Sequence, residues 1–267
     1  MNECRIGAVS YLNTKPLVHG MDPVRDGIQL HFDLPGRLAD RLAADELDIA
    51  LIPTIEVLRH PGYRVVSDAC IGCRGPVWSV KLLSRCPIGE IRTLALDEGS
   101  RTSVALVQIL MQHEHGFQPG LRPLPIEADW QSADSDAVVI IGDRAMQSGR
   151  HQEFPCQVDL GQWWYDQTGL PFVFAVWTAR PGLSAERTQQ AARILSRCRD
   201  AGLHEAVDLA RKHAAYFDLT PEQCEDYFLR YLHFHLGTAE RAGMDRFRVL
   251  AGDLGLVEKS GELQFHA

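Results

Sequence analysis

The chain has 267 residues, of which 45% are hydrophobic and 23% charged, a composition typical of a folded globular protein. Its formal net charge of −8 argues against nucleic acid as the main partner. No apolar run approaches the ~20 residues that a membrane helix needs, and residues 1–5 lack the basic start and apolar core of a signal peptide. We therefore expect a cytoplasmic protein without membrane or nucleic-acid partners.

Strand-like and helix-like patterns alternate along the first two thirds of the chain, which indicates an α/β fold with parallel strand pairing. The last third, from Ser184, is predicted to be helical, and Thr220 to Gln223 have the residue types of a capped helix start. Strands are expected at 4–9, 28–35, 48–53, 63–72, 75–85, 91–97, 136–142 and 171–181. Helices are expected at 15–21, 35–47, 54–59, 100–116, from 143 onward, and at 184–202, 203–218 and 220–237.

The sequence contains a weak internal echo. Residues 6–17 (strand, polar turn, helix) resemble residues 94–106, and residues 46–58 resemble residues 134–146. Each member of the second pair has an acidic residue, an apolar strand and a sharp turn into a helix. The echo predicts two similar α/β units, each with two polar turns that follow strands.

Two extended runs flank the second unit and are predicted to be paired crossing strands, near 75–84 and 171–180. This arrangement predicts a discontinuous first lobe, 1–84 with 178–267, and a second lobe, 85–177. Such a two-lobed clamshell holds its ligand in a cleft at the carboxyl ends of its strands.

The first polar turn contains Ser10, Tyr11, Asn13 and Thr14, more hydrogen-bonding residues than helix capping needs. In a clamshell, this turn would face polar turns of the second lobe across the cleft. Helix N-termini carry partial positive charge and free N–H groups, so the cleft would favour an anion. The facing residues would be Gly99 to Ser103, Gly142 and Asp143.

The seven cysteines have irregular spacing, which fits a reducing compartment better than a disulfide framework. Cys70 and Cys73 form a lone CxxC, which we interpret as buried thiols because no second pair or suitably spaced histidine accompanies it. His113 with His115, and a second histidine pair, are spaced by two and would point apart on a helix. No metal site is expected.

Six motifs give the chain a resemblance to a known family: GAVSYLNTKPL, DIALIPTIEVLR, CRGPVWSVKLLSR, LALDEGSRTSVALVQIL, IGDRAM and GLPFVFAVWTARPG. From Arg5 to about Leu256, the chain resembles the chorismate dehydratases of the futalosine route to menaquinone. The resemblance implies a fold like type II periplasmic binding proteins and no metal or organic cofactor. It implies a lyase that removes water from chorismate, giving 3-[(1-carboxyvinyl)oxy]benzoate.

The resemblance also points to site residues. Asn13 and Ser79 are expected near the leaving hydroxyl and the reacting carbons. Ser10, Thr102 and Ser103 suit a carboxylate. Three further substrate contacts are expected from Thr14, Ser100 and Gly142.

Two charged residues in the motifs leave alternatives open. Asp143 is the nearest motif carboxylate for a general base, but it could be a helix N-cap, and the enolpyruvyl carboxylate of the substrate could take the proton instead. Arg101 could pair with a substrate carboxylate or point to solvent.

Rival functions share the predicted fold. One is a non-catalytic cytoplasmic solute-binding protein for a small carboxylate, and another is an effector-binding domain of a transcription factor. The third is the sister enzyme, 1,4-dihydroxy-6-naphthoate synthase. The oligomeric state stays open, with a homodimer contact through the C-terminal helices as one possibility.

Overall fold

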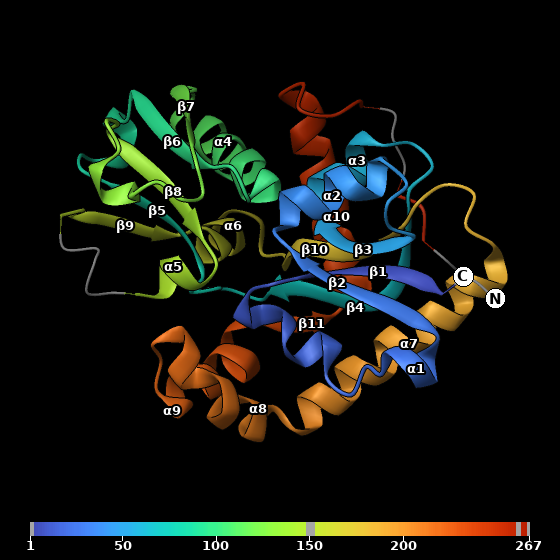
Figure 1. Ribbon diagram of the computed structural model, residues 1–267. Coiled ribbons are helices and arrows are strands. Elements are labelled where there is room, and N and C mark those ends of the chain that lie inside the picture. The colour runs from blue at the N-terminus through green and yellow to red at the C-terminus, as the bar shows by residue number, and fades with distance from the viewer. Residues whose placement is uncertain (1–2, 148–152, 260–262, 266–267) are drawn as a thin grey trace.

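Two β-sheets organise the chain, and the structure, a computed structural model, describes residues 3–147, 153–259 and 263–265. One sheet has the strand order β11-β4-β10-β3-β1-β2, and the other has the order β7-β6-β8-β5-β9 (Figure 1). The strands of the first sheet are β1 (Cys4–Val9), β2 (Ile28–Asp33), β3 (Ile49–Pro53), β4 (Arg64–Cys73), β10 (Phe172–Ala179) and β11 (His233–His235). Those of the second are β5 (Val80–Ser84), β6 (Thr93–Asp97), β7 (Gly120–Leu124), β8 (Ala137–Ile141) and β9 (Cys156–Asp159).

Helices cover both sheets and dominate the last third of the chain (Figure 1). The α-helices are α1 (Pro23–Asp26), α2 (Pro35–Ala43), α3 (Thr54–Arg59), α4 (Arg101–His115), α5 (Asp143–Met146), α6 (Leu160–Thr168), α7 (Ala185–His204), α8 (Ala206–His213), α9 (Pro221–Asp226) and α10 (Thr238–Asp253). Short 3-10 turns include η1 (Leu12–Thr14) and η2 (Pro16–Val18), and a π-helical turn, η7, spans Tyr227–Tyr231.

The two sheets repeat one topology. In the first, β1 pairs in parallel with β2 and β3, and the antiparallel β10 lies beside β3. In the second, β6 pairs in parallel with β7 and β8, and the antiparallel β5 lies beside β8. The internal echo predicted from the sequence is therefore confirmed as two similar α/β units.

This repeat brings the polar turns together. The chain leaves the carboxyl ends of β1, β3, β6 and β8 directly into η1, α3, α4 and α5. Because ligands bind at the carboxyl ends of strands in open α/β sheets, these four turns define the candidate site. The prediction of a two-lobed α/β fold with a helical C-terminal segment is confirmed.

Each predicted crossing strand lies within one sheet. Within the described residues, β5 pairs with β8 and β9 of the five-stranded sheet, and β10 pairs with β3 and β4 of the six-stranded sheet. The chain passes between the sheets at 74–79 and, through α6, at 160–171. The predicted lobes, 1–84 with 178–267 and 85–177, stay a prediction, and their outer ends at 1–2 and 266–267 lie outside the described residues. We propose that the boundaries between the lobes lie in the connections at 74–79 and 160–171.

Two predictions next to the site are wrong. Residues 15–21 contain the three-residue 3-10 turn η2 (Pro16–Val18) rather than a longer helix, and Gly20 reverses the backbone with φ +68°. The extended run predicted from 75 starts as a strand only at Val80, since Gly75 and Trp78 have φ +121° and +66°. This bend carries residues 77–79 to the inner side of the connection, beside the site described below.

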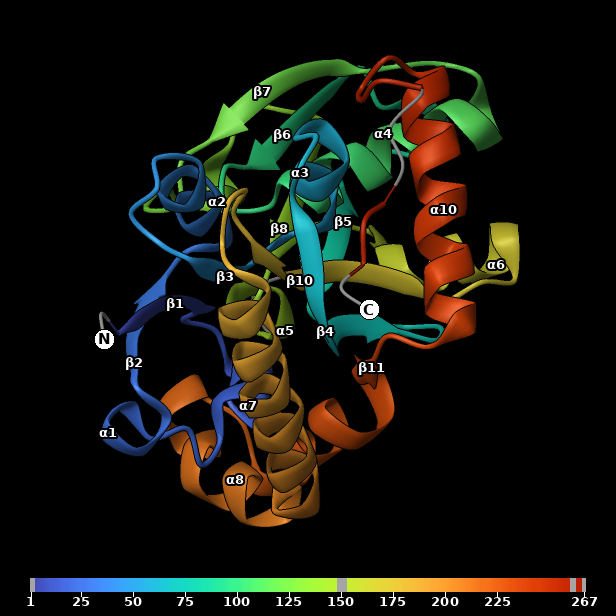
Figure 2. The same cartoon turned by 90° about the vertical axis from the view of Figure 1, so that its right-hand side faces the viewer.

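The C-terminal segment packs mainly on the six-stranded sheet. Helix α7 lies against β4 and α10 against β10, and α10 also reaches α4 of the other sheet (Figure 2). Helix α9 starts with the predicted capping box between Thr220 and Gln223. The prediction that 220–237 is all helical is wrong, because residues 227–231 form a π-helical turn and residues 233–235 pair with β4 as strand β11.

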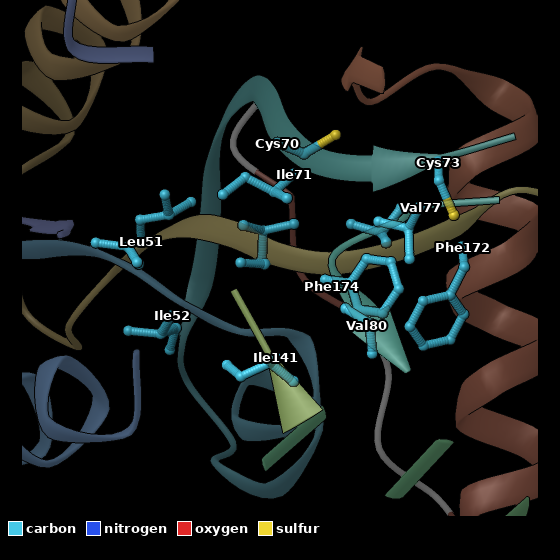
Figure 3. Close-up of a cluster of buried hydrophobic side chains, with 14 of the residues drawn as sticks. Leu51, Ile52, Cys70, Ile71, Cys73, Val77, Val80, Ile141, Phe172 and Phe174 are labelled. Carbon is cyan, nitrogen blue, oxygen red and sulfur yellow. The ribbon is translucent and has the colours of Figure 1, made fainter. Parts of the chain in front are cut away.

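An apolar core continues from one sheet to the other near the site. Figure 3 shows Ile71 and Phe174 of the first sheet close to Val80 and Ile141 of the second. Cys70 and Cys73, the residues of the CxxC motif, are both buried in β4, and burial raises the pKa of both thiols. Within the described residues, no helix is both long and apolar enough to cross a membrane.

Candidate active site

A cavity lies where the carboxyl ends of the two sheets face each other. About 60 Å³ of it can hold the centre of a water molecule, and the space that atoms leave free around it, part of it open to solvent, is about 510 Å³. Its floor is apolar and includes the Ile71, Val80, Ile141 and Phe174 side chains of Figure 3. Polar groups come from both sheets, and every lining residue within the described ranges is uncharged. The lining consists of Val9, Tyr11, Asn13, Pro35, Pro53, Ile71, Val77, Ser79, Val80, Gly99, Ser100, Thr102, Ser103, Ile141, Gly142, Phe174 and Ala175.

The N-terminus of α4 forms one wall. Ser100 is its N-cap residue, and its side chain makes no capping hydrogen bond to the first turn. The helix has 15 residues, so its first-turn N–H groups and partial positive charge favour an anion in the cavity. Ser103 lines the same wall. Thr102 also spans the two sheets, because its hydroxyl accepts a hydrogen bond from the Ile55 amide at 3.3 Å.

Asn13 and Ser79 meet on the opposite wall through a third residue, Tyr227. The Tyr227 hydroxyl donates to Ser79 Oγ at 2.7 Å, and the Asn13 side chain lies near enough to the same hydroxyl to oppose the rise in its pKa. Thr14 lies behind this group and donates from Oγ1 to Asn13 Oδ1 at 3.2 Å. Thr14 is fully buried and outside the cavity lining, and its hydroxyl holds the Asn13 side chain.

Tyr11 reaches across the cavity to the second sheet. A Cβ at Gly142 would lie 3.1 Å from the Tyr11 ring, so the ring rests directly on this glycine. The Tyr11 hydroxyl is buried and has no hydrogen-bond partner among the described residues. Burial raises its pKa, so the phenol stays protonated at neutral pH and is a free donor.

Asp143 lies just behind the lining, as the first residue of α5. Gly142 is the N-cap residue of that helix, so the N-cap interpretation of Asp143 is wrong. Its Oδ1 instead accepts from the Leu12 amide of the first sheet at 3.2 Å. Burial raises the pKa of Asp143 to about 6, opposed by the Leu12 hydrogen bond and by Lys15.

Arg101 pairs with two acids of the first lobe, and its contact with a substrate carboxylate stays a prediction. Its guanidinium lies 2.8 Å from both carboxylate oxygens of Asp40 and 3.2 Å from Glu56 Oε2. Both acids belong to helices of the first sheet, so Arg101 ties the lobes together at the cavity edge. Ser10 is exposed and outside the lining, with its amide donating to the Asp33 carbonyl.

Seven of the predicted site residues line the cavity: Asn13, Ser79, Gly99, Ser100, Thr102, Ser103 and Gly142. Four other predicted residues, Ser10, Thr14, Arg101 and Asp143, lie outside the lining. Sequence reasoning gave no role to Tyr11, although it lies within the polar turn. It missed Tyr227, which stands 148 positions from Ser79 and belongs to no motif.

An ion pair with a fully buried carboxylate stands behind the α4 wall. Arg144 forms an ion pair with Asp97, the last residue of β6, and donates to the Ile126 carbonyl at 2.8 Å. Asp97 also accepts from the Gly99 amide at 2.9 Å, so it shapes the turn that carries Ser100. Within the described ranges, no group of three or more His, Cys, Asp or Glu side chains is arranged to hold a metal ion.

Comparison with known families assigns the chain. The sequence model of a family described as menaquinone biosynthesis matches residues 4–253. The chain belongs to this family. Two curated relatives are each named chorismate dehydratase. The one from Thermus thermophilus is 27% identical over 263 residues and covers 92% of this chain and 94% of its own length. The one from Campylobacter jejuni is 24% identical over 248 residues and covers 90% of this chain and 94% of its own length. The resemblance drawn from the motifs is confirmed.

This member of the menaquinone biosynthesis family shares its fold with several solved structures of other proteins. A protein from Archaeoglobus fulgidus matches with a TM-score of 0.78 at 14% identity, over 96% of this chain and 99% of its own. A Candida albicans protein described as having the generic periplasmic binding protein fold matches with a TM-score of 0.68 at 12% identity, over 97% of this chain and 92% of its own. The periplasmic aliphatic sulphonate binding protein of Escherichia coli matches with a TM-score of 0.63 at 14% identity, over 98% of this chain and 90% of its own. The predicted clamshell of the periplasmic binding protein type is confirmed.

Proposed function

We propose that the protein is a lyase that converts chorismate into 3-[(1-carboxyvinyl)oxy]benzoate and water. The observation that carries the proposal is the family match over residues 4–253, together with relatives named chorismate dehydratase. The cavity supports it, since it is partly enclosed, apolar at the floor and lined by hydrogen-bond donors from both sheets. By the same resemblance, we propose that the reaction belongs to the futalosine route and takes place in the cytoplasm.

The reaction is an elimination that balances within the substrate. A proton leaves the ring carbon that bears the enolpyruvyl ether, and the electron pair of that C–H bond forms a new ring double bond. The neighbouring C–O bond breaks, its pair leaves with the hydroxyl oxygen, and a proton completes the water. No electron is gained or lost overall, and the product ring is aromatic. The protein therefore needs to orient the substrate and stabilise the charge that develops on the leaving oxygen.

We assign charge stabilisation to Asn13 and Ser79, which stand together on one wall. Ser100, Thr102 and Ser103, with the first-turn N–H groups of α4, would hold a carboxylate of the substrate on the other wall. Neutral donors suit this task because a closed cavity excludes water and strengthens each hydrogen bond to an anion. Exclusion of water also suppresses competing reactions of chorismate.

The general base has two candidates. Asp143 has a pKa of about 6, close to what a base working near neutral pH requires. However, it lies outside the lining and already accepts from the Leu12 amide. The alternative base is the enolpyruvyl carboxylate of the substrate. In an Asp143→Asn variant, loss of turnover with intact binding identifies Asp143, whereas retained turnover identifies the substrate carboxylate.

The test of the proposed function is direct. Purified protein is mixed with chorismate, and the products are separated and weighed by mass spectrometry. We expect a product lighter by one water with an aromatic absorbance, and Ser79→Ala and Asn13→Ala should each lower kcat by about 100-fold, as for loss of an oxyanion donor. The matched control is Ser196→Ala, which should keep full activity. Ser196 lies on α7, away from the cavity, and its hydroxyl donates to Asp68.

Two other outcomes favour the rival functions. If chorismate binds and is left intact by the wild-type protein, the clamshell is a solute-binding protein for a small carboxylate. If chorismate neither binds nor reacts, the sister activity, 1,4-dihydroxy-6-naphthoate synthase, becomes the next substrate class to assay. Either result rejects the dehydratase proposal.

A further inference from the structure

Tyr227 links the C-terminal segment to the candidate active site. It begins the π-helical turn η7, is fully buried, and places its hydroxyl 2.7 Å from Ser79 Oγ. We propose that Tyr227 is a positioning residue that fixes the Ser79 hydroxyl as a hydrogen-bond donor into the cavity. The proposal deepens the proposed function and rests on it, because the donor would serve the leaving hydroxyl of the substrate.

The direction of the hydrogen bond carries the argument. A hydroxyl has one proton to donate and two lone pairs to accept. Because Tyr227 donates to Ser79 Oγ, the Ser79 proton is not used in this contact and can point into the cavity that Ser79 lines. The Ser79 main chain is held as well, since its amide donates to the Val77 carbonyl at 2.8 Å and its carbonyl accepts from Gly142 at 2.9 Å.

Two hydrogen bonds order the groups around Ser79. Thr14 donates to Asn13 Oδ1, the Asn13 side chain lies near the Tyr227 hydroxyl, and Tyr227 donates to Ser79. Burial raises the pKa of Tyr227, which keeps its proton in place at neutral pH. Linked hydrogen bonds polarise one another, so the Ser79 hydroxyl becomes a stronger donor than an isolated serine.

The ring of Tyr227 is held in place by its neighbours. Trp78, the residue before Ser79, packs edge-on against Tyr227 with ring centroids 5.7 Å apart. Trp78 also contacts Tyr231 from the end of the same π-helical turn, at 5.5 Å. Single π-helical turns inside helical segments frequently occur at functional sites, because the extra residue redirects a side chain. Here the turn directs Tyr227 toward Ser79.

The expected chemical consequence is specific to the leaving group. When the C–O bond of the substrate breaks, negative charge develops on the departing oxygen. A hydrogen bond from Ser79 to that oxygen is strongest in the transition state, so its loss lowers kcat and leaves KM nearly unchanged. The proton removed from the ring carbon then joins the departing oxygen to complete the water.

The experiment compares Tyr227→Phe with Tyr231→Phe, a matched control that removes a hydroxyl from the same turn and keeps the ring beside Trp78. We expect Tyr227→Phe to lower kcat for chorismate about 10- to 100-fold with KM within about twofold. Tyr231→Phe should match the wild type. In the Ser79→Ala background, Tyr227→Phe should cause no further loss, because the hydroxyl that it positions is already absent.

Three results would overturn the proposal: a Tyr227→Phe variant as active as Tyr231→Phe, a change in KM alone, or an equal loss in the Ser79→Ala background. If Tyr227→Phe does not fold, 3-fluorotyrosine at position 227 replaces it. That residue keeps the hydroxyl bond and must retain kcat within about threefold.

A crystal structure separates this proposal from the proposed function. If the wild-type protein leaves chorismate unchanged, the proposed function fails, and the Ser79 side chain in Tyr227→Phe still tests the positioning. We expect Ser79 to adopt another rotamer or several in that variant. A Ser79 side chain identical to the wild type would overturn the positioning role whatever the substrate is.

Discussion

Asp143 is a half-buried carboxyl group whose environment favours its neutral form. Burial raises its pKa from 3.8 to about 6, so the folded protein binds this proton more tightly than the unfolded chain does. Below about pH 4 both states are protonated, and the group has no effect on the free energy of unfolding. As the pH rises from about 4 to 6, the unfolded chain ionises first and the folded state loses stability. Above pH 6 the loss is constant.

The Asp143→Asn variant should therefore be more stable than the wild type at pH 7 and nearly equal to it at pH 3. The expected gain at pH 7 is on the order of 3 kcal/mol, since the pKa is raised from 3.8 to about 6, one pKa unit corresponds to about 1.4 kcal/mol, and an amide can still accept from the Leu12 N–H. Urea unfolding at both pH values measures it. The exposed Asp253→Asn is the control. A gain of equal size at both pH values would contradict the pKa argument.

The turn between β8 and α5 depends on a glycine for two reasons. Gly142 has φ +65° and ψ −148°, a conformation that other residues rarely adopt, and a Cβ there would lie 3.1 Å from the Tyr11 ring. Gly169, at the end of α6, has φ +67°, and a Cβ added there would meet no atom within 4 Å. An alanine at position 169 therefore shows the free-energy cost of a positive φ without the added cost of crowding against a neighbouring side chain.

We expect Gly142→Ala to lower the free energy of unfolding by about 3 kcal/mol, the sum of strain and overpacking. Gly169→Ala should lower it by about 1 kcal/mol, from the left-handed backbone alone. Guanidinium unfolding of both variants checks the difference. Equal losses would show that Tyr11 does not rest on Gly142 in solution.

Elements whose signals are local were the predictable part of this fold. The apolar strands, the capping box at Thr220 and the repeated strand–turn–helix pattern can all be recognised within about fifteen residues. The strand His233–His235 was missed because its pairing with β4 depends on a segment more than 150 positions away. The turn at Trp78 was missed because a positive φ in a tryptophan has no sequence signature.

The difference between local and distant signals also explains which site residues could be predicted. Asn13, Ser79 and Ser100 stand in motifs at strand ends, so their place in one cavity could be predicted from the sequence. The contact between Tyr227 and Ser79 joins positions that no pattern connects. The partners of Arg101 were equally hidden, because Asp40 and Glu56 belong to exposed-looking helix faces of the other lobe.

Contacts across the cleft hold the whole molecule closed over the cavity. Arg101 of α4 pairs with Asp40 and Glu56, and Arg37 of α2 lies 3.9 Å from Glu127. The Leu12 amide bound to Asp143 adds a further link. A substrate enclosed by both walls must enter before these contacts form. The ion pairs are therefore expected to set the balance between open and closed forms.

Arg101 makes the largest of these links and gives the clearest prediction. The Asp40 side chain is 65% exposed, so added salt screens that pair, whereas Glu56 is 5% exposed and screened less. We expect Arg101→Gln to raise KM for chorismate about 5-fold, which corresponds to about 1 kcal/mol of lost closure. The radius of gyration measured by X-ray scattering should increase as open forms become populated.

Salt provides the second half of this test. In the wild type, raising the ionic strength should increase KM, and in Arg101→Gln the same change should have a smaller effect, because the screened pair is already absent. The control is Arg122→Gln, which removes an exposed ion pair with Asp134 inside the second lobe and should leave KM, its salt dependence and the scattering unchanged. If Arg101→Gln behaves like Arg122→Gln in all three measurements, the Arg101 contacts do not govern closure. The cavity would then open by another route.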